Sequence, residues 1–476
     1  MSNELSPFIH TFKNMDKYYF FDVNQHKIVN ITQESFEILK HKKSAFNREL
    51  NALQEQGFLS SNRVKVVEHP ATEMLEDILS NKIKKLNLQL TQQCNFRCDY
   101  CVYSGDYDNR NHSNKRMKWE VAKKGIDFLI GSAKDSSNIN ISFYGGEPLI
   151  EFKLIQACME YATQEADGKV VTFSMTTNGS LLNDEVIEFL SNFNIHLTIS
   201  LDGPRDVHDK NRRFATNNCG TFDTVYKNIK NIELKYPDFK KNIQFSMVID
   251  PSINLNCLNE FVADEEDFFK ETAIMGSIIS DHYRKEKVNV NEDFISEWQY
   301  NKFKYFLNLF EEIPDKNNSQ LMRSSNALLI DFINDSSKSY YPLLERSHHA
   351  GPCIPGQLRL FMNTEGDFYP CERVNENSKI MKIGNVDDGL NVTRVDKLLN
   401  VGKLNEEECK NCFAFRGCIV CAAMADDGNE EEELSGELKH LACISSRRNF
   451  DEMLRDACTL KDLGFRSDMI KVNKNY

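Results

Sequence analysis

Three cysteines, Cys94, Cys98 and Cys101, lie close together in residues 91–101. They follow the alternating apolar run of residues 86–90, which predicts a strand that ends just before them. A structural zinc site needs four protein ligands, so three thiolates on one loop do not complete such a site. Three thiolates can instead hold three irons of a four-iron cluster and leave the fourth iron open.

A second group of cysteines lies near the C-terminus. Its members are Cys353, Cys371, Cys409, Cys412, Cys418, Cys421 and Cys443. Two Cys-x-x-Cys pairs among them suit zinc ribbons, so zinc remains an alternative for this group. Next to an iron–sulfur loop of the first kind, further iron–sulfur clusters are the stronger interpretation.

Composition and charge narrow the class of protein. The chain has 476 residues, of which 41% are hydrophobic and 27% charged, as in ordinary globular proteins with two or three domains. The net charge of −13 repels phosphate backbones, so we expect no nucleic-acid partner. No apolar run approaches the ~18 residues that cross a bilayer, and the N-terminus lacks a signal-peptide pattern; we expect no membrane partner and a cytoplasmic protein.

The first 80 residues predict a small winged-helix-like α+β unit. Residues 18–22 and 26–31 read as a β-hairpin, and residues 35–43 and 47–56 as helices. Such a unit could simply cap the main domain. It could also capture a peptide as an added strand on the edge of its hairpin.

From residue 82 to about 280, strand and helix patterns alternate six times. The predicted strands are 85–91, 138–144, 170–176, 194–201, 242–249 and 272–279, and the predicted helices are 118–132, 149–166, 184–192, 222–235, 255–269 and 292–310. Six such units predict a parallel sheet that closes only partly into a barrel. The site should lie on the loops at the carboxyl ends of the strands.

Those loops carry the candidate binding residues. The first holds the three cysteines, and the second holds Gly145, Gly146, Glu147 and Pro148. Glycines before a carboxylate allow the backbone to approach a ligand closely. The third and fourth loops carry Thr176, Asn178 and Ser200, followed by Asp202, His208 and Arg212.

After a helical link, the C-terminal region predicts a hairpin that delivers Cys371, then a compact cysteine loop and a helix over 447–463. We expect the link to be helical over about 314–346 and the acidic run 430–433 to be a solvated turn.

Together these motifs resemble the radical SAM enzymes. The resemblance rests on Cys94-x3-Cys98-x2-Cys101 with Tyr100 before the last cysteine, and on the motif at residues 145–148. The cysteine-rich end resembles the SPASM extension, although its four-cysteine run is spaced two, five, two instead of two, five, three. The implied organisation is a peptide (leader) recognition element over 1–80, a partial (β/α)6 TIM-like barrel over 81–315, a helical linker over 316–350 and a SPASM domain over 351–476.

The resemblance implies S-adenosylmethionine and [4Fe–4S] clusters, three in all, as cofactors. Cys94, Cys98 and Cys101 would hold the cluster that binds S-adenosylmethionine. The residues implied to contact S-adenosylmethionine are Tyr100, Gly145, Gly146, Glu147, Pro148, Thr176, Asn178 and Ser200.

The resemblance also divides the later cysteines between two auxiliary clusters. The proximal cluster would use Cys353, Cys371 and Cys421 and lacks a fourth ligand. The distal cluster would use Cys409, Cys412, Cys418 and Cys443. Glu372, which follows Cys371 directly, is the candidate base.

The resemblance is strongest to maturases of cysteine-rich peptides of the ranthipeptide or sactipeptide type. It implies an oxidoreductase that forms thioether links in a ribosomally made precursor peptide, whose leader residues 1–80 would bind, with a flavodoxin- or ferredoxin-type electron donor. The alternatives are a sulfatase-type formylglycine maturase and a maturase that forms carbon–carbon links or epimerised residues. A peptide-binding metal scaffold without catalysis is the alternative from another class.

Overall fold

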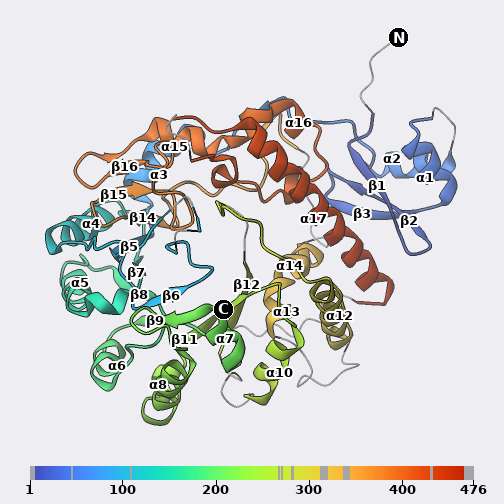
Figure 1. The fold of residues 1–476 in the computed structure, drawn as a ribbon. Coiled ribbons are helices and arrows are strands. Elements are labelled where there is room, and N and C mark those ends of the chain that lie inside the picture. The colour runs from blue at the N-terminus through green and yellow to red at the C-terminus, as the bar shows by residue number, and fades with distance from the viewer. Residues whose placement is uncertain are drawn as a thin grey trace.

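The computed structural model describes residues 6–43, 47–104, 106–107, 110–265, 269, 272–279, 283–310, 320–335, 343–428 and 432–465. A large curved sheet with helices along its outer side forms the main body (Figure 1). A small N-terminal unit lies at one side of this body, and the long helix α17 (Gly436–Asp462) runs between the two.

The N-terminal unit is a three-stranded antiparallel sheet with two helices. Its strands are β1 (Ile9–Asn14), β2 (Lys17–Asp22) and β3 (Lys27–Ile31), in the order β1-β2-β3, and its helices are α1 (Gln33–Lys40) and α2 (Arg48–Glu55). The predicted hairpin and both predicted helices are confirmed, with β2 and β3 as the hairpin. Strand β1 was not predicted, because its apolar residues Ile9 and Phe12 do not alternate with period two.

Strand β2 packs on both of its faces. Phe20 belongs to a small core with Phe36 of α1 and Leu50 of α2. Its neighbour Phe21 points the other way and meets Phe450 of α17 at a ring separation of 5.4 Å. Alternation along one strand therefore both closes the N-terminal unit and docks it on the rest of the protein.

The main sheet confirms the six predicted βα units. Its six strands run parallel in the order β12-β11-β9-β8-β7-β5. They are β5 (Lys85–Thr91), β7 (Asn138–Gly145), β8 (Val170–Thr177), β9 (Ile195–Ser200), β11 (Ile243–Ile249) and β12 (Ile274–Ile278). The helices after them are α4 (Trp119–Gly131), η2 (Pro148–Glu151) with α5 (Phe152–Gln164), α6 (Asp184–Ser191), α8 (Phe222–Lys235), α10 (Asn256–Asp264) and α12 (Glu292–Leu309).

The two faces of this sheet differ in polarity. In β7, Ile139, Ile141 and Phe143 are buried on one face. Asn140, on the opposite face, donates through Nδ2 to Thr172 Oγ1 at 2.9 Å. The apolar face packs against the helices, so the inner face of the sheet is lined by polar groups.

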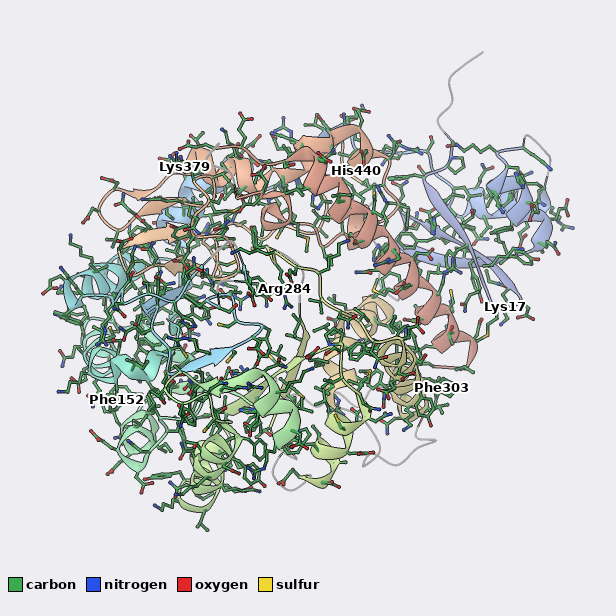
Figure 2. The ribbon with its side chains drawn as sticks, viewed as in Figure 1. Lys17, Phe152, Arg284, Phe303, Lys379 and His440 are labelled. Carbon is green, nitrogen blue, oxygen red and sulfur yellow. The ribbon has the colours of Figure 1, made fainter. Side chains whose placement is uncertain are left out.

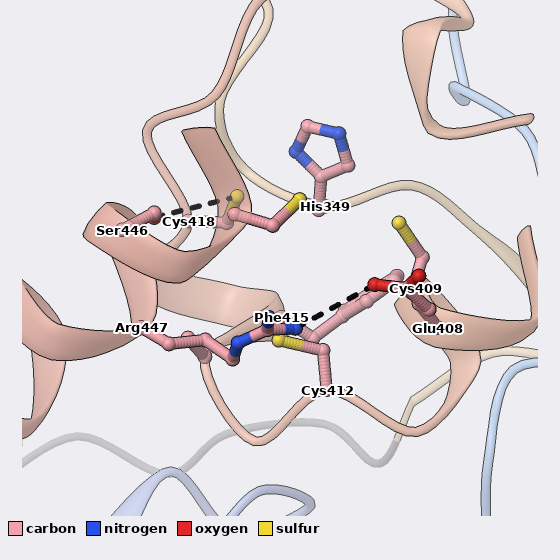
Figure 3. A pocket seen from close by; sticks show the side chains of 10 residues that line it. His349, Glu408, Cys409, Cys412, Phe415, Cys418, Ser446 and Arg447 are labelled. Atoms are coloured by element: carbon pink, nitrogen blue, oxygen red, sulfur yellow. Dashed lines mark hydrogen bonds and ion pairs between the residues drawn. The ribbon is translucent and has the colours of Figure 1, made fainter. Parts of the chain in front are cut away.

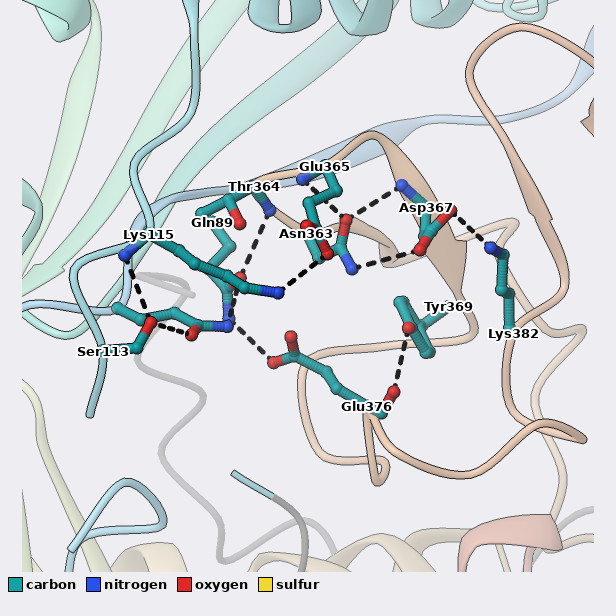
Figure 4. Close-up of polar contacts among 11 residues, drawn as sticks. Gln89, Ser113, Lys115, Asn363, Thr364, Glu365, Asp367, Tyr369, Glu376 and Lys382 are labelled. Carbon is teal, nitrogen blue, oxygen red and sulfur yellow. Dashed lines mark hydrogen bonds and ion pairs between the residues drawn. The ribbon is translucent and has the colours of Figure 1, made fainter. Parts of the chain in front are cut away.

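The predicted C-terminal hairpin is present and extends the main sheet, which the sequence did not reveal. Strand β14 (Leu360–Met362) pairs parallel with β5, and β15 (Asp367–Tyr369), β16 (Gly384–Asn385) and β17 (Gly389–Leu390) continue antiparallel to make ten strands. Figure 4 shows the polar contacts at this junction. Gln89 of β5 accepts from the Thr364 backbone at 3.3 Å and donates to Glu376 at 2.7 Å.

Short elements complete the described chain. The helices are α3 (Leu75–Asn81), α7 (Arg205–Asn211), α9 (Pro237–Lys240), α13 (Gln320–Ser325), α14 (Ala327–Asp335), α15 (Val392–Leu399) and α16 (Glu406–Lys410). The 3-10 turns are η1 (Thr72–Met74), η4 (Val401–Asn405), η5 (Phe415–Gly417) and η6 (Ala422–Ala425). Two further pairs of strands are β4 (Val66–Val67) with β13 (Arg346–Ser347), and β6 (Phe96–Cys98) with β10 (Arg212–Phe214).

The predicted helical link includes α13 and α14, but residues 311–319 and 336–342 lie outside the described chain, as do residues 430–431 of the acidic run. The predicted last helix was wrong at its start, since α17 begins at Gly436 and not at residue 447. Its first turns bury Cys443 and Ser446 and expose Leu441 and Ile444, so their apolar residues do not mark the inner face.

No helix in the described ranges is long and apolar enough to cross a membrane. Figure 2 shows Arg284 near the centre of the molecule, between the sheet and the C-terminal region. There the segment after β12 forms an isolated bridge with Tyr107, and the Arg284 guanidinium lies 5.8 Å from the Tyr107 ring.

Candidate radical site

The three-cysteine loop leaves the carboxyl end of β5, as predicted. Its β6 segment pairs with β10, which places Arg212 opposite Cys98. The thiols are buried and close enough to influence one another: burial, then Glu147, raise the pKa of Cys94 to about 12, and Cys101 adds to the rise. A thiolate there needs a positive partner, and bound iron supplies one. This donor set therefore fits three irons of a four-iron cluster.

The glycine loop after β7 lies directly on the cysteine loop. Gly146 N–H donates to Thr91 O at 2.9 Å, and Glu147 N–H donates to Gln93 O at 2.8 Å. A Cβ on Gly145 would lie 2.2 Å from Thr91 O, and one on Gly146 would lie 2.1 Å from Gln93 O. Only glycine allows the two loops to come this close.

The Glu147 carboxylate is fully buried and joins two strand ends. It accepts hydrogen bonds from Leu149 N at 3.0 Å, from Thr177 Oγ1 at 2.7 Å and from Asn178 N at 2.7 Å. Burial raises its pKa, while the bonds from Asn178 and Thr177 act in the opposite direction. All three of these partners belong to the protein, so the implied contact of Glu147 with S-adenosylmethionine stays a prediction.

The neighbouring loop residues divide between this network and the inner face. Asn178 donates through Nδ2 to Asn95 at 2.9 Å and lies 3.8 Å from Cys94 Sγ. Thr176 is exposed and Ser200 half-buried, whereas the adjacent Thr177 bonds Glu147 and was missed by the sequence analysis. The alternation of side chains along β8 could have identified Thr177, because it places Thr176 and Thr177 on opposite faces of the sheet. Pro148 is buried and begins η2.

A buried ion pair lies behind the cysteine loop. Arg212 donates to both carboxylate oxygens of Asp202, at 2.8 and 3.1 Å, and its guanidinium lies 5.4 Å from the Tyr100 ring. The Tyr100 hydroxyl also donates to Asp202. The sequence analysis named Asp202 and Arg212 as residues after the fourth strand. It did not predict their ion pair or the position of Arg212 opposite Cys98, because both depend on the fold.

His208 and Asp209 support the backbone. His208 is fully buried, accepts from Asp202 N at 3.3 Å and contacts Thr221 Oγ1 at 3.0 Å; burial, then Arg212, lower its pKa to about 4. Asp209 Oδ1 accepts from Thr221 N and Phe222 N at 2.7 and 2.8 Å. These contacts fix the start of α8.

Glu372 extends from the C-terminal hairpin toward the first strand of the sheet. It accepts from Asn87 Nδ2 of β5 at 2.9 Å and pairs with Arg359 at 3.1 Å. Nearby, Glu376 and Arg110 form a nearly fully buried ion pair that the sequence did not indicate. Arg110 lies 5.1 Å from the Phe361 ring, so the inner face carries several charged groups beside Glu372.

The structure gathers the last cysteines into two groups. Figure 3 shows a pocket lined by the four residues predicted for the distal cluster, Cys409, Cys412, Cys418 and Cys443. Cys353, Cys371 and Cys421 form the other group: burial and then Cys421 raise the pKa of Cys353, and burial and then Glu372 raise that of Cys371 to about 11. Among the described residues, no three His, Cys, Asp or Glu side chains converge on a point that would hold a single metal ion.

Comparison with known proteins defines the class. The family model for the radical SAM superfamily matches residues 88–263, which span the cysteine loop, the glycine loop and the Asp202–Arg212 pair. Residues 88–263 are thus a radical SAM domain.

Two curated proteins and one solved structure show what the chain is similar to. It is 25% identical over 376 residues to the cysteine-type anaerobic sulfatase-maturating enzyme of Clostridium perfringens (strain 13), covering 75% of this chain and 92% of that protein. It is 26% identical over 204 residues to the radical SAM cyclopropyl synthase TigE of Paramaledivibacter caminithermalis, covering 40% of this chain and 42% of that protein. The solved structure "Native anSMEcpe with bound AdoMet and Kp18Cys peptide" has a TM-score of 0.56 at 19% identity, covering 79% of this chain and 99% of that one. The likeness to this structure shows that the fold is shared.

Proposed function

We propose that this radical SAM enzyme is a peptide maturase that installs thioether links between a cysteine sulfur and a carbon of another residue in a precursor peptide. The observation that carries the proposal is the join of β14 to β5, which holds Cys371 and Glu372 beside the inner face of the radical SAM sheet. S-adenosylmethionine and a four-iron cluster, when bound, supply a 5′-deoxyadenosyl radical that removes hydrogen from an unactivated carbon.

The loops around the cluster would hold the cofactors. Cys94, Cys98 and Cys101 would ligate iron. Gly145 and Gly146 would lie beside the cofactor, because they hold the glycine loop against the cysteine loop. The predicted contacts of Tyr100, Glu147, Pro148, Thr176, Asn178 and Ser200 with S-adenosylmethionine remain part of the proposal.

Glu372 would take the proton from the peptide's thiol. Arg359 and Asn87 hold its carboxylate toward the inner face, and a carboxylate there can accept a proton. Cys353, Cys371 and Cys421 would hold the proximal cluster beside it and leave one iron open to that sulfur. The hydrogen atom of the carbon would go to the 5′-deoxyadenosyl radical, the thiol proton would go to Glu372, and the remaining electron would go to the proximal cluster as the carbon–sulfur bond forms.

The N-terminal unit would capture the leader peptide on β3. The other edge strand, β1, is covered by α17, since Arg455 donates to Lys13 O and His10 contacts Asp451 at 2.6 Å. In the described part of the chain, β3 pairs with β2 alone. Its outer edge can therefore accept an additional strand. The sulfatase-maturase structure named above contains a bound peptide, which supports a peptide partner.

Two adjacent proline variants test the capture site. Neighbouring N–H groups of a strand point to opposite edges of that strand. Of the two variants Ile28→Pro and Val29→Pro, one therefore removes an N–H that bonds β2, and the other removes an N–H on the outer edge of β3. The outward variant should weaken binding of a labelled leader peptide while S-adenosylmethionine cleavage continues. Wild-type peptide affinity in that variant would contradict the capture role.

A sulfatase-type formylglycine maturase is the second candidate, because the match to the Clostridium perfringens enzyme spans 92% of that protein. Mass spectrometry of a cysteine-containing peptide after turnover separates the two. A thioether retains sulfur, loses two hydrogens and resists alkylation, whereas formylglycine loses the sulfur. A carbon–carbon link leaves the thiol free to alkylate.

Iron analysis tests the cofactor content. Anaerobically reconstituted protein should contain about twelve irons if three four-iron clusters are present. About four irons per chain together with bound zinc would mean that the later cysteines hold zinc instead of the auxiliary clusters. The flavodoxin- or ferredoxin-type electron donor stays a prediction, and reduction by each purified carrier tests it.

A further inference from the structure

The four-cysteine pocket contains a buried nitrogen atom, Nε2 of His349, to which the proposed function assigns no role. His349 lines this pocket and is only 3% exposed, and its Nε2 is buried without a hydrogen-bond partner among the described residues (Figure 3). Its other ring nitrogen, Nδ1, accepts from Gly351 N–H at 3.3 Å. A neutral ring that accepts at Nδ1 carries its hydrogen on Nε2. His349 therefore has an N–H donor without a protein acceptor, in a pocket lined by four thiols.

The His349 ring is held in place and kept neutral. His348 accepts from Gly402 N–H through Nε2 at 2.9 Å, so its Nδ1 carries the hydrogen and donates to His349 O at 3.0 Å. The two rings lie 4.2 Å apart. Burial, then His348 and Lys439, lower the pKa of His349 to about 2. A neutral ring with Nδ1 occupied is a hydrogen-bond donor and not a metal ligand.

A second donor reaches the same thiols from α17. Lys439 is fully buried, and its Nζ donates to Cys409 Sγ at 3.3 Å. It lies one helical turn before Cys443, so the helix that supplies one cysteine also supplies the cation. Ser446, one turn further along, contacts Cys418 Sγ at 3.7 Å. A buried ammonium is costly unless a negative group faces it, and a thiolate-bound cluster is such a group.

We propose that His349 and Lys439 are positioning residues that donate hydrogen bonds to the sulfurs of the distal cluster and raise its reduction potential. This inference rests on the proposed function, in which Cys409, Cys412, Cys418 and Cys443 hold that cluster. Reduction adds negative charge to a cluster, so N–H donors and a nearby cation stabilise the reduced form. A carboxylate lies near each cysteine group: Glu372 is beside the three cysteines, and Glu408 lines the four-cysteine pocket, where it pairs with Arg447.

Matched variants of the reconstituted full-length protein test this role. His349→Leu removes the donor, and His349→Gln has similar size and keeps an N–H. Likewise, Lys439→Met removes the charge and Lys439→Arg keeps it. The readouts are iron per chain and the midpoint potential of each cluster from an EPR-monitored redox titration, with Cys412→Ala identifying the distal signal.

We expect H349L and K439M to retain wild-type iron and to lower the distal potential. The reduced-to-oxidised ratio at a fixed potential should fall at least tenfold, or about 59 mV for a one-electron couple, with partial recovery in H349Q and K439R. An unchanged potential would overturn the inference alone. Loss of iron from H349L would make His349 a ligand and overturn it as well. A wild-type protein without iron at this site would overturn the proposed cluster together with the inference.

Discussion

Replacing Gly146 by alanine tests whether the contact between the glycine loop and the cysteine loop is as tight as the structure has it. The added Cβ would lie 2.1 Å from Gln93 O, while contacts under 3.0 Å essentially do not occur. The two loops would have to separate by about 0.9 Å. That shift would stretch the bond from Glu147 N–H to Gln93 O from 2.8 to about 3.7 Å, beyond hydrogen-bond length.

The cost follows from these two effects. Overpacking a tight contact costs about 1–3 kcal/mol, and leaving a buried donor without its acceptor costs about as much again, so we expect the unfolding free energy to fall by about 2–6 kcal/mol. Because the shift moves the backbone next to Cys94, the reconstituted variant should also lose iron and cleave less S-adenosylmethionine.

Gly131→Ala is the matched control. Gly131 ends α4 on the surface, and a Cβ there would meet nothing within 4 Å. Alanine in a helix should raise stability by up to about 1 kcal/mol. Urea unfolding followed by circular dichroism, together with iron analysis, measures both variants. If Gly146→Ala unfolds within about 0.5 kcal/mol of wild type and holds wild-type iron, the argument from close packing is wrong.

Three other predictions follow from the same site. Cys98→Ala should remove the iron of one cluster and abolish 5′-deoxyadenosine formation; unchanged product by chromatography would end the radical proposal. Asp202→Asn should lower the unfolding free energy by about 3–5 kcal/mol because it leaves the buried Arg212 charge uncompensated, whereas Asp223→Asn, in an exposed ion pair, should leave the unfolding free energy at its wild-type value. The lowered pKa of His208, about 4 against 6.5 unfolded, should cost about 3 kcal/mol as pH falls from 6.5 to 4, since the unfolded state binds the proton first. His208→Gln should remove that part of the pH dependence, and an unchanged profile in urea unfolding would contradict it.

The strands and helices of the main sheet were predictable because their residues follow the periods of two and 3.6. The strand ends in turn located the cysteine and glycine loops, since parallel strands present their carboxyl ends on one edge. Strand β1 and the start of α17 escaped prediction, because Ile9 and Phe12 do not alternate and Leu441 and Ile444 face solvent.

Contacts between distant segments decided the rest of the site. Thr177 reaches Glu147 while the neighbouring Thr176 faces away, and Arg212 lies beside Cys98 through a two-strand pairing across more than a hundred residues. Neither pairing has a local signal, because each depends on how loops from different strands meet.

The sequence by itself indicated the radical SAM domain, since cysteine spacing and a glycine-rich loop are local properties of the chain. Only the tertiary structure decided what surrounds that chemistry. It joined β14 to β5, which places Glu372 against Asn87. It also brought His349 and Lys439 to four cysteines, three from residues 409–418 and one from α17. Such neighbours are set by packing and hydrogen bonding across the fold, which residue types and spacing do not encode locally.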